Sequence, residues 1–124
     1  MKPKKINLGI VPAEALIQRV RGQRVILDAD LAGIYGVPTK RLNQAIKRSL
    51  ERFPSDFSFV LKPQEVASLR SQIATSKGRG GRRYPPRVFT EHGAIMAASV
   101  LNSPRAVQMS VFVKGFLNAN RNSV

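Results

Sequence analysis

Two short stretches near the N-terminus are rich in β-branched residues, and most of the remaining chain carries apolar residues at helical spacing. Residues 16–20 and 24–27 are β-prone runs separated by a segment that contains Gly22, which predicts a β-hairpin. Residues 57–61 and 87–89 predict two further strands. The predicted strands are short, and helical segments separate the hairpin from each of the later two.

Capping residues and prolines mark the predicted helix boundaries. Asp28 and Asp30 offer N-caps to a first helix, which Gly36 ends. Thr39 is expected to cap a second helix over about 40–52. The other three helices are expected to open at Pro63, at Thr90 and at Ser103-Pro104. The order β-β-α-α-β-α-β-α-α predicts an α+β fold with short antiparallel strands and C-terminal helices.

The length of 124 residues fits one small domain, and a hydrophobic content of 43% is enough for a folded core. We expect a basic N-terminal arm over 1–14, the domain itself over 15–118 and a short tail over 119–124. The arm lacks an unbroken apolar segment and a small-residue cleavage site, so we expect no signal peptide and a cytoplasmic location. No apolar run reaches the roughly 20 residues that span a bilayer, so no membrane partner is expected.

The charge balance is strongly basic, with 21 Lys and Arg against seven Asp and Glu and a formal net charge of +14. Such an excess favours a polyanionic partner. The absence of cysteine excludes a disulfide scaffold and thiolate chemistry, and with a single histidine it argues against a structural zinc site. His92 and the pair Asp28 and Asp30 fit helix-start roles better than metal binding. We therefore expect no cofactor, no metal and no enzymatic activity.

The segment from Asp28 to Phe53 has the features of a helix-turn-helix-like unit. Ala32 is a small residue inside the first helix, Gly36 suits the turn, and Leu42 with the apolar positions after it would lock the two helices together. The alternative is an ordinary αα-hairpin whose basic face is only solvated.

Cations and amides gather on the opposite side of the second helix. The N-terminal part of a recognition helix enters the major groove, where Lys or Arg binds guanine and Asn or Gln binds adenine. We expect the residues nearest the bases to be Thr39, Lys40, Asn43, Gln44 and Lys47. The residues expected at phosphates are Arg41, Arg48 and Arg52.

A glycine- and arginine-rich stretch at 76–83 provides a second candidate contact. Glycines allow close approach to a phosphate, and guanidinium groups bind phosphates bidentately. The spacing does not match a nucleotide-binding P-loop. The alternative is a solvent-exposed connection. The candidate residues are Lys77, Arg79, Arg82 and Arg83, with Arg87 in the strand that follows.

The last helix is apolar over more than one stripe. A helix of this kind needs cover from two directions: one cover is the core of the domain, and the second is expected to be a symmetry mate or an absent C-terminal segment. We expect a homodimer to be possible through Met109, Phe112, Val113 and Phe116. A central core helix in a small domain explains the same pattern equally well.

The ordered motifs in 15–116 resemble the KilA-N-related domain at the N-terminus of phage and prophage antirepressor-type proteins. The motifs are a glycine turn, Leu-Asp-x-Asp-Leu-Ala, Tyr-Gly-Val, Arg-Phe-Pro-x-Asp-Phe, the Gly/Arg loop and Phe-Thr-Glu-x-Gly. The resemblance implies a cytoplasmic DNA-binding module with a regulatory use in a phage or prophage.

The combined expectation is a non-enzymatic module that binds double-stranded DNA and regulates transcription. Two rivals stay open. An RNA-binding accessory protein would need aromatic residues exposed on a sheet. A protein-interaction module that sequesters a repressor would use the apolar last helix and would tolerate the loss of the charges in 40–52.

Overall fold

A four-stranded antiparallel sheet lies between two groups of buried apolar side chains. The computed structural model describes residues 7–8, 11–69 and 85–118. The strand order is β3-β4-β6-β5, so the last strand along the chain inserts between two earlier ones. The strands are β3 (Ile17–Val20), β4 (Gln23–Leu27), β5 (Ser58–Val60) and β6 (Arg87–Phe89).

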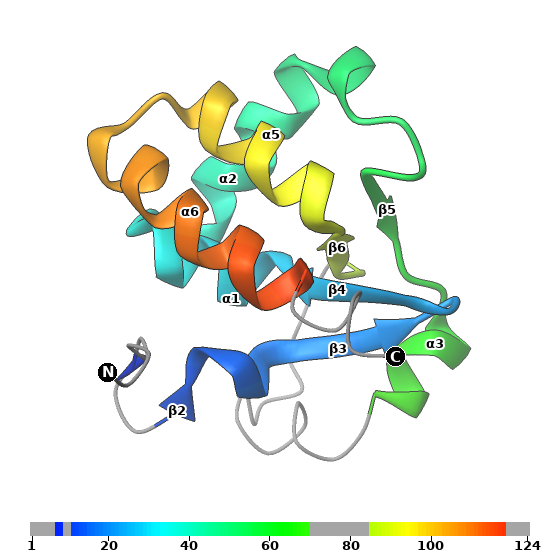
Figure 1. Cartoon of the computed structure of the whole chain (residues 1–124). Helices are drawn as coiled ribbons and strands as arrows, with labels where there is room; N and C mark the ends of the chain where they lie inside the picture. Colours follow the sequence, from blue (N-terminus) through cyan, green and yellow to red (C-terminus); the bar gives the residue numbers. More distant parts are fainter. Residues whose placement is uncertain (1–6, 9–10, 70–84, 119–124) are drawn as a thin grey trace.

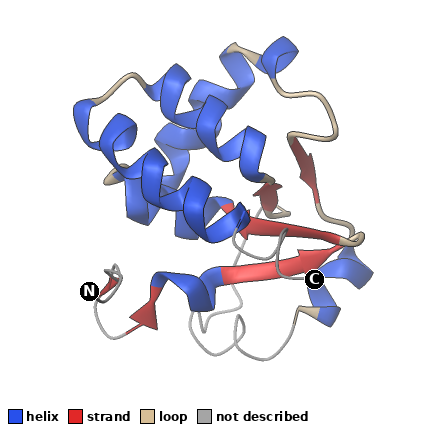
Figure 2. Ribbon diagram, viewed as in Figure 1, coloured by secondary structure: helices blue, strands red, loops and turns tan. Residues whose placement is uncertain are grey.

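Four helices gather over one face of this sheet, and a fifth, short helix lies on the other side (Figures 1 and 2). The four are α1 (Asp28–Tyr35), α2 (Thr39–Arg48), α5 (Glu91–Leu101) and α6 (Pro104–Asn118), and the fifth is α3 (Pro63–Ser68). From β3 onward, the expected order of elements and the α+β class are confirmed.

The chain before β3 contains elements that the sequence pattern did not predict. Strands β1 (Asn7–Leu8) and β2 (Val11–Pro12) pair with each other, and a 3₁₀ helix, η1 (Ala13–Leu16), leads into β3. Each of these strands has only two residues, which is too few for period-2 alternation to be recognised.

Alternation along the strands explains the two cores. Ile26 pairs with Phe89 across β4 and β6, and both side chains join the cluster formed with the four helices. Leu27 pairs with Val88 one position along, and both face the cluster on the α3 side. Successive side chains in a strand point to opposite faces, so each strand contributes to both clusters.

The β3–β4 turn is tied to α3 by one ion pair. Arg21 and Gly22 form the two-residue turn, and both have positive φ. The Arg21 guanidinium donates to both carboxylate oxygens of Glu65 at 2.7 and 2.9 Å and lies 4.0 Å from the centre of the Phe59 ring. These hydrogen bonds, with one from the Lys62 backbone, lower the pKa of Glu65 to about 2. The pair holds α3 beside the hairpin.

Predicted helix signals are confirmed at three ends. Gly36 adopts a left-handed conformation after α1, and Val37 N donates to Ala32 O at 3.0 Å, as in a Schellman motif. Thr90 Oγ1 accepts from Gly93 N before α5, and Ser103 Oγ accepts from Ala106 N before α6. These signals depend on residues within a few positions of each other, which is why sequence alone identified them.

Gly93 marks a close approach of α5 to the segment before β5. A Cβ added there would lie 1.8 Å from the carbonyl oxygen of Phe57. Thr90 Oγ1 donates to Asp56 O at 2.9 Å and Thr90 N donates to Phe57 O at 3.0 Å, so the start of α5 is fastened to the segment before β5. Only glycine fits between them.

Candidate nucleic-acid interface

Helix α2 has one buried face and one exposed cationic face. Leu42 and Ile46 are buried in the cluster shared with α1, α5 and α6. Gln44 lies at the centre of the opposite side, and all its neighbours on that side are exposed cations. The exposed residues of this outward face of α2 are Lys40, Arg41, Gln44, Lys47 and Arg48. The predicted division of the helix into two faces is therefore confirmed.

A three-residue turn sets the direction in which α2 leaves α1. Gly36, Val37 and Pro38 join the helices, and Leu42 N donates to Pro38 O at 3.1 Å. The expected Thr39 cap is wrong, because Pro38 occupies the N-cap position with extended backbone and makes no side-chain capping bond. Thr39 is instead the first, half-buried residue of α2. Proline pre-sets the entry into the helix in place of a side-chain cap.

The start of α1 also differs from the expected Asp28 and Asp30 caps. Leu27 stands at the N-cap position without a side-chain capping bond, and both aspartates lie in the first turn of the helix. Carboxylates in a first turn are stabilised by the helix dipole. Asp28 is 1% exposed, and its Oδ1 accepts from Ala29 N at 2.7 Å.

Asp28 joins α1 to α2 and to the sheet through its second carboxylate oxygen. Oδ2 accepts from Asn43 Nδ2 at 3.0 Å and from Arg87 N at 3.4 Å. Asn43 Nδ2 also donates to Thr39 O at 3.3 Å. The amide donors that would contact adenine are thus engaged within the protein, and we assign Asn43 to holding α2 in place rather than to the outward face of α2.

Arg87 lies on the sheet and not on the outward face of α2. Its Nη1 donates to Ser58 Oγ at 3.0 Å, and Ser58 Oγ donates to Val88 O. Burial lowers the pKa of the half-buried Arg87, while the charge of nearby Asp28 acts in the opposite direction. These contacts give Arg87 a structural role in joining β5 to β6.

The second helix ends earlier than expected. Helix α2 stops at Arg48 instead of continuing to 52, and a 3₁₀ turn, η2 (Leu50–Arg52), follows. Leu50 is one of the apolar positions after Leu42 that were expected to pack between the helices, but it is 51% exposed. Phe53 is buried, and its ring packs edge-on against that of Phe89 with the two ring centroids 6.3 Å apart. Because a 3₁₀ turn is tighter than an α-helical turn, Phe53 rather than Leu50 points into the core. Arg52 is exposed in this turn.

Arg105 is a cation beside the α1–α2 turn that the sequence analysis missed. Its Nε donates to Ile34 O at 3.1 Å, and its side chain covers Gly36 so closely that an added Cβ would lie 2.6 Å from Cδ. Arg105 remains exposed at the start of α6. No local pattern relates it to a turn some 70 positions earlier, so only the packing of α6 on α1 reveals it.

The glycine- and arginine-rich stretch lies outside the described residues, which resume at 85. The prediction for its four cations therefore stays a prediction, and those residues are Lys77, Arg79, Arg82 and Arg83. The described chain on either side belongs to α3 and β6.

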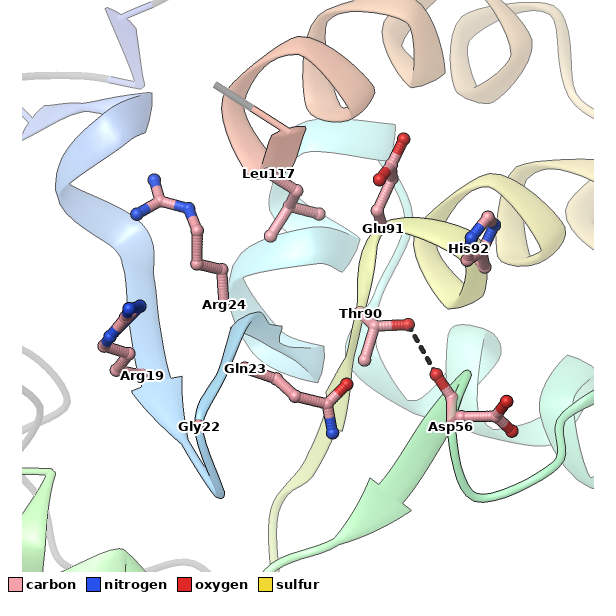
Figure 3. Close-up of a pocket in the computed structure, with 9 residues that line it drawn as sticks. All are labelled: Arg19, Gly22, Gln23, Arg24, Asp56, Thr90, Glu91, His92 and Leu117. Carbon is pink, nitrogen blue, oxygen red and sulfur yellow. Dashed lines mark hydrogen bonds between the residues drawn. The ribbon is translucent and has the colours of Figure 1, made fainter. Parts of the chain in front are cut away.

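A pocket of about 410 Å³ opens between the β3–β4 hairpin, the start of α5 and the end of α6 (Figure 3). Arg19 and Arg24 come from the hairpin side, and Asp56 and Glu91 lie across from them. Two cations balance two carboxylates in this pocket, whereas all the charged residues of the outward face of α2 are cations. The other lining residues are Gly22, Gln23, Thr90, His92 and Leu117.

His92 lies at the start of α5, and its ring stacks on that of Phe57 with the two ring centroids 5.5 Å apart. Among the residues that the structure describes, no group of three or more His, Cys, Asp or Glu side chains could hold a metal ion. In the same ranges of the chain, no helix is both long and apolar enough to cross a membrane.

Comparison with protein families identifies a match that covers most of the chain. Residues 15–100 match the ORF6N domain, a phage-associated family, and the chain belongs to this family. The matched segment contains the hairpin, the α1–α2 unit and nearly all of α5, and it ends before α6. Neither the curated proteins nor the solved structures include a significant match.

Proposed function

We propose that the chain binds double-stranded DNA through the outward face of α2 and regulates transcription in a phage or prophage. The observation that carries the proposal is a helix with four exposed cations around one exposed amide, held on its inner side by buried Leu42 and Ile46. A rigid helix of this kind suits the major groove, and Gln44 suits adenine.

The contacts divide into two groups by position. Gln44 lies at the centre of the outward face and is proposed to reach base edges together with Lys40 and Lys47, which lie on one side of it. Arg41 and Arg48 lie on the other side of Gln44 and suit phosphates, as does Arg52 in η2. Arg105 is a further exposed cation beside the α1–α2 turn, where its Nε donates to Ile34 O. A relation to KilA-N modules, a cytoplasmic location and the lack of catalysis belong to the same proposal.

The RNA-binding rival has less support in this fold. Sequence-specific RNA-binding sheets stack bases on exposed aromatic rings. On the described strands, Phe59 and Phe89 are both buried, one in each cluster. The repressor-sequestering rival keeps one supporting observation, which is the exposed apolar surface of α6.

A salt series tests the proposal directly. Fluorescence anisotropy with a labelled random-sequence duplex, the matching single strand and duplex RNA is expected to show the highest affinity for duplex DNA. The logarithm of affinity is expected to fall with the logarithm of salt concentration, with a slope steeper than about −2, because several cations displace counterions. Equal affinity for all three polymers would contradict a preference for duplex DNA and would indicate that the protein binds polyanions in general.

A matched pair of charge reversals locates the interface. The double change Lys40→Glu and Lys47→Glu is expected to lower duplex affinity at least about tenfold, because two cations on the outward face become repulsive. The control is Lys62→Glu with Lys114→Glu, which alters the net charge equally at exposed positions outside α2. Equal losses in both variants would contradict the role of α2.

A further inference from the structure

Helix α6 buries one side in the domain and leaves an apolar side exposed. Ala106, Val113 and Leu117 are buried against the cluster that includes α1 and α5. On the other side, Val107 is 52% exposed and Val111 is 68% exposed. Phe112 is 40% exposed at the edge of the same surface.

This structure changes the set of residues expected to form a dimer. Val113 is fully buried, and Met109 is partly buried against the same cluster, so neither is available to a partner. Phe112 remains on the surface, while the side chain of Phe116 lies outside the described part of the chain. Val107 and Val111, which were not among the residues expected at the dimer contact, are the most exposed large apolar residues of the described part of α6.

Among the described side chains of α6, the exposed cations Arg105 and Lys114 flank a strip that contains no charged residue. Its members are uncharged and exposed, and we call them the neutral face of α6: Pro104, Val107, Gln108, Val111, Phe112 and Gly115. At 100° per residue, Arg105 and Lys114 lie about 80–100° to either side of its centre. The chain has a net charge of +14, and this strip along the 15-residue helix contains none of its cations.

We propose that the neutral face of α6 binds a second copy of this chain, with α6 packed on α6 about a two-fold axis. Two copies with a charge of +14 repel each other over most of their surfaces, so they can approach only where cations are absent. An acidic protein partner would be drawn to the cationic surfaces instead. The two-fold arrangement makes the same face complementary to itself.

The geometry of the helix identifies the central contact. Val111 is the midpoint of Pro104–Asn118, and it is also the most exposed of the three apolar residues. In a symmetric pairing, equivalent residues at the midpoint meet near the two-fold axis. Gly115, which has no side chain, lies one turn further along the same face and allows the two backbones to approach closely.

The size of the face predicts a weak dimer. A helix of 15 residues is about 22 Å long at 1.5 Å per residue. One such helix from each copy falls at the small end of specific interfaces, below about 1,200 Å² in total. The dimer is thus expected to depend on concentration and, if both copies bind DNA, to strengthen through the increased local concentration. The pairing itself does not depend on the proposed DNA binding.

Sedimentation of the nucleic-acid-free full chain provides the first test. The average mass is expected to rise from one chain toward two between about 5 µM and about 500 µM. Raising the salt from about 0.15 M to about 0.5 M is expected to favour the dimer, because salt screens repulsion between the cationic copies. A single-chain mass at every concentration would overturn the proposal, as would a dimer that dissociates when salt is added.

Two substitutions at the midpoint locate the interface. Val111→Glu is expected to weaken the dimer at least about tenfold, although it lowers the net repulsion between copies. The control is Ala67→Glu on the exposed side of α3, which is expected to dimerise like the original chain. Circular dichroism checks that both variants fold. Dimerisation of Val111→Glu at the original strength would assign the contact to another surface.

A cross-link supplies a readout that does not depend on loss of binding. The chain contains no cysteine, so Val111→Cys introduces a single thiol. In the proposed dimer, mild oxidation joins two Val111→Cys chains through a disulfide bond at the midpoints of their α6 helices. The Ala67→Cys variant is expected to stay mainly monomeric under the same conditions. Equal cross-linking of both variants would indicate random collision and contradict the proposal.

Discussion

Helices α2 and α6 bury equivalent inner faces in one core and present opposite outer faces. Leu42 and Ile46 of α2 join the same cluster as Val113 and Leu117 of α6. The outward face of α2 has four cations, whereas the neutral face of α6 has none. The inner residues decide how the helices pack, and packing places little restriction on the outer ones. Outer faces that differ this strongly therefore indicate different partners.

The comparison also shows where the net charge of +14 is useful. Exposed cations occur on α2, in its 3₁₀ extension and at Arg105 beside the turn, and further ones occur at Arg19, Arg21, Lys62 and Lys114. None of the described cations lies within the neutral face of α6. A general solubilising charge would need no such separation. The separation supports one polyanion-binding surface and one surface for a like-charged copy.

The largest expected effect comes from the inner face of α2. Leu42→Ala is expected to lower the free energy of unfolding by about 2–5 kcal/mol, because Leu42 is fully buried and truncation leaves a cavity. Lys47→Ala, on the exposed side of the same helix, is expected to change it by less than about 0.5 kcal/mol. Urea unfolding measures both values. Similar losses in the two variants would show that the faces are not separated as described.

The α1–α2 turn, where α6 touches the helix pair, gives the next largest effect. Gly36→Ala is expected to destabilise the chain by about 1–3 kcal/mol, since φ is +74° and Arg105 occupies the space of a new Cβ. Gly33→Ala, in the middle of α1 with no atom within 4 Å of the added Cβ, is expected to stabilise by about 0.5–1 kcal/mol. Thermal unfolding measures the stability of both variants. An unchanged stability of Gly36→Ala would contradict this geometry of the turn.

The smallest of the three effects tests the role of Asn43. Asn43→Ala is expected to lower stability by about 1–2 kcal/mol, because buried Asp28 loses a hydrogen-bond donor. Its effect on duplex affinity, measured below the melting transition, is expected to be less than about threefold. The comparison variant is Gln44→Ala, which should reduce affinity more and stability less. A reversed pattern would return Asn43 to the group of base-contacting residues.

Local signals account for the parts of the fold that could be predicted. The glycine at the end of α1, the proline at the start of α3 and the Thr90 cap of α5 each depend on a few neighbouring residues. The periodic pattern also separated the two faces of α2 correctly. Signals failed where two neighbours compete for one position, as when Pro38 rather than Thr39 stands at the N-cap of α2.

Longer-range contacts account for what could not be predicted. Asp28 and Asn43 form a hydrogen bond only because α1 folds back beside α2. Arg105 meets Gly36 only because α6 crosses α1, and Val113 rather than Val111 turns inward because α5 and α1 lie on that side. A helical wheel shows which residues share a side but not which side meets a neighbour.

Residue chemistry and spacing were therefore enough to establish the α+β class, the order of the elements from β3 onward and the cationic side of α2, because each depends on local conformation or composition. The contacts of Asn43, Arg87 and Arg105, and the orientation of α6, depend on segments far apart in the chain. Burial and hydrogen bonding at these positions depend on the neighbours that folding supplies, and no local pattern specifies those neighbours.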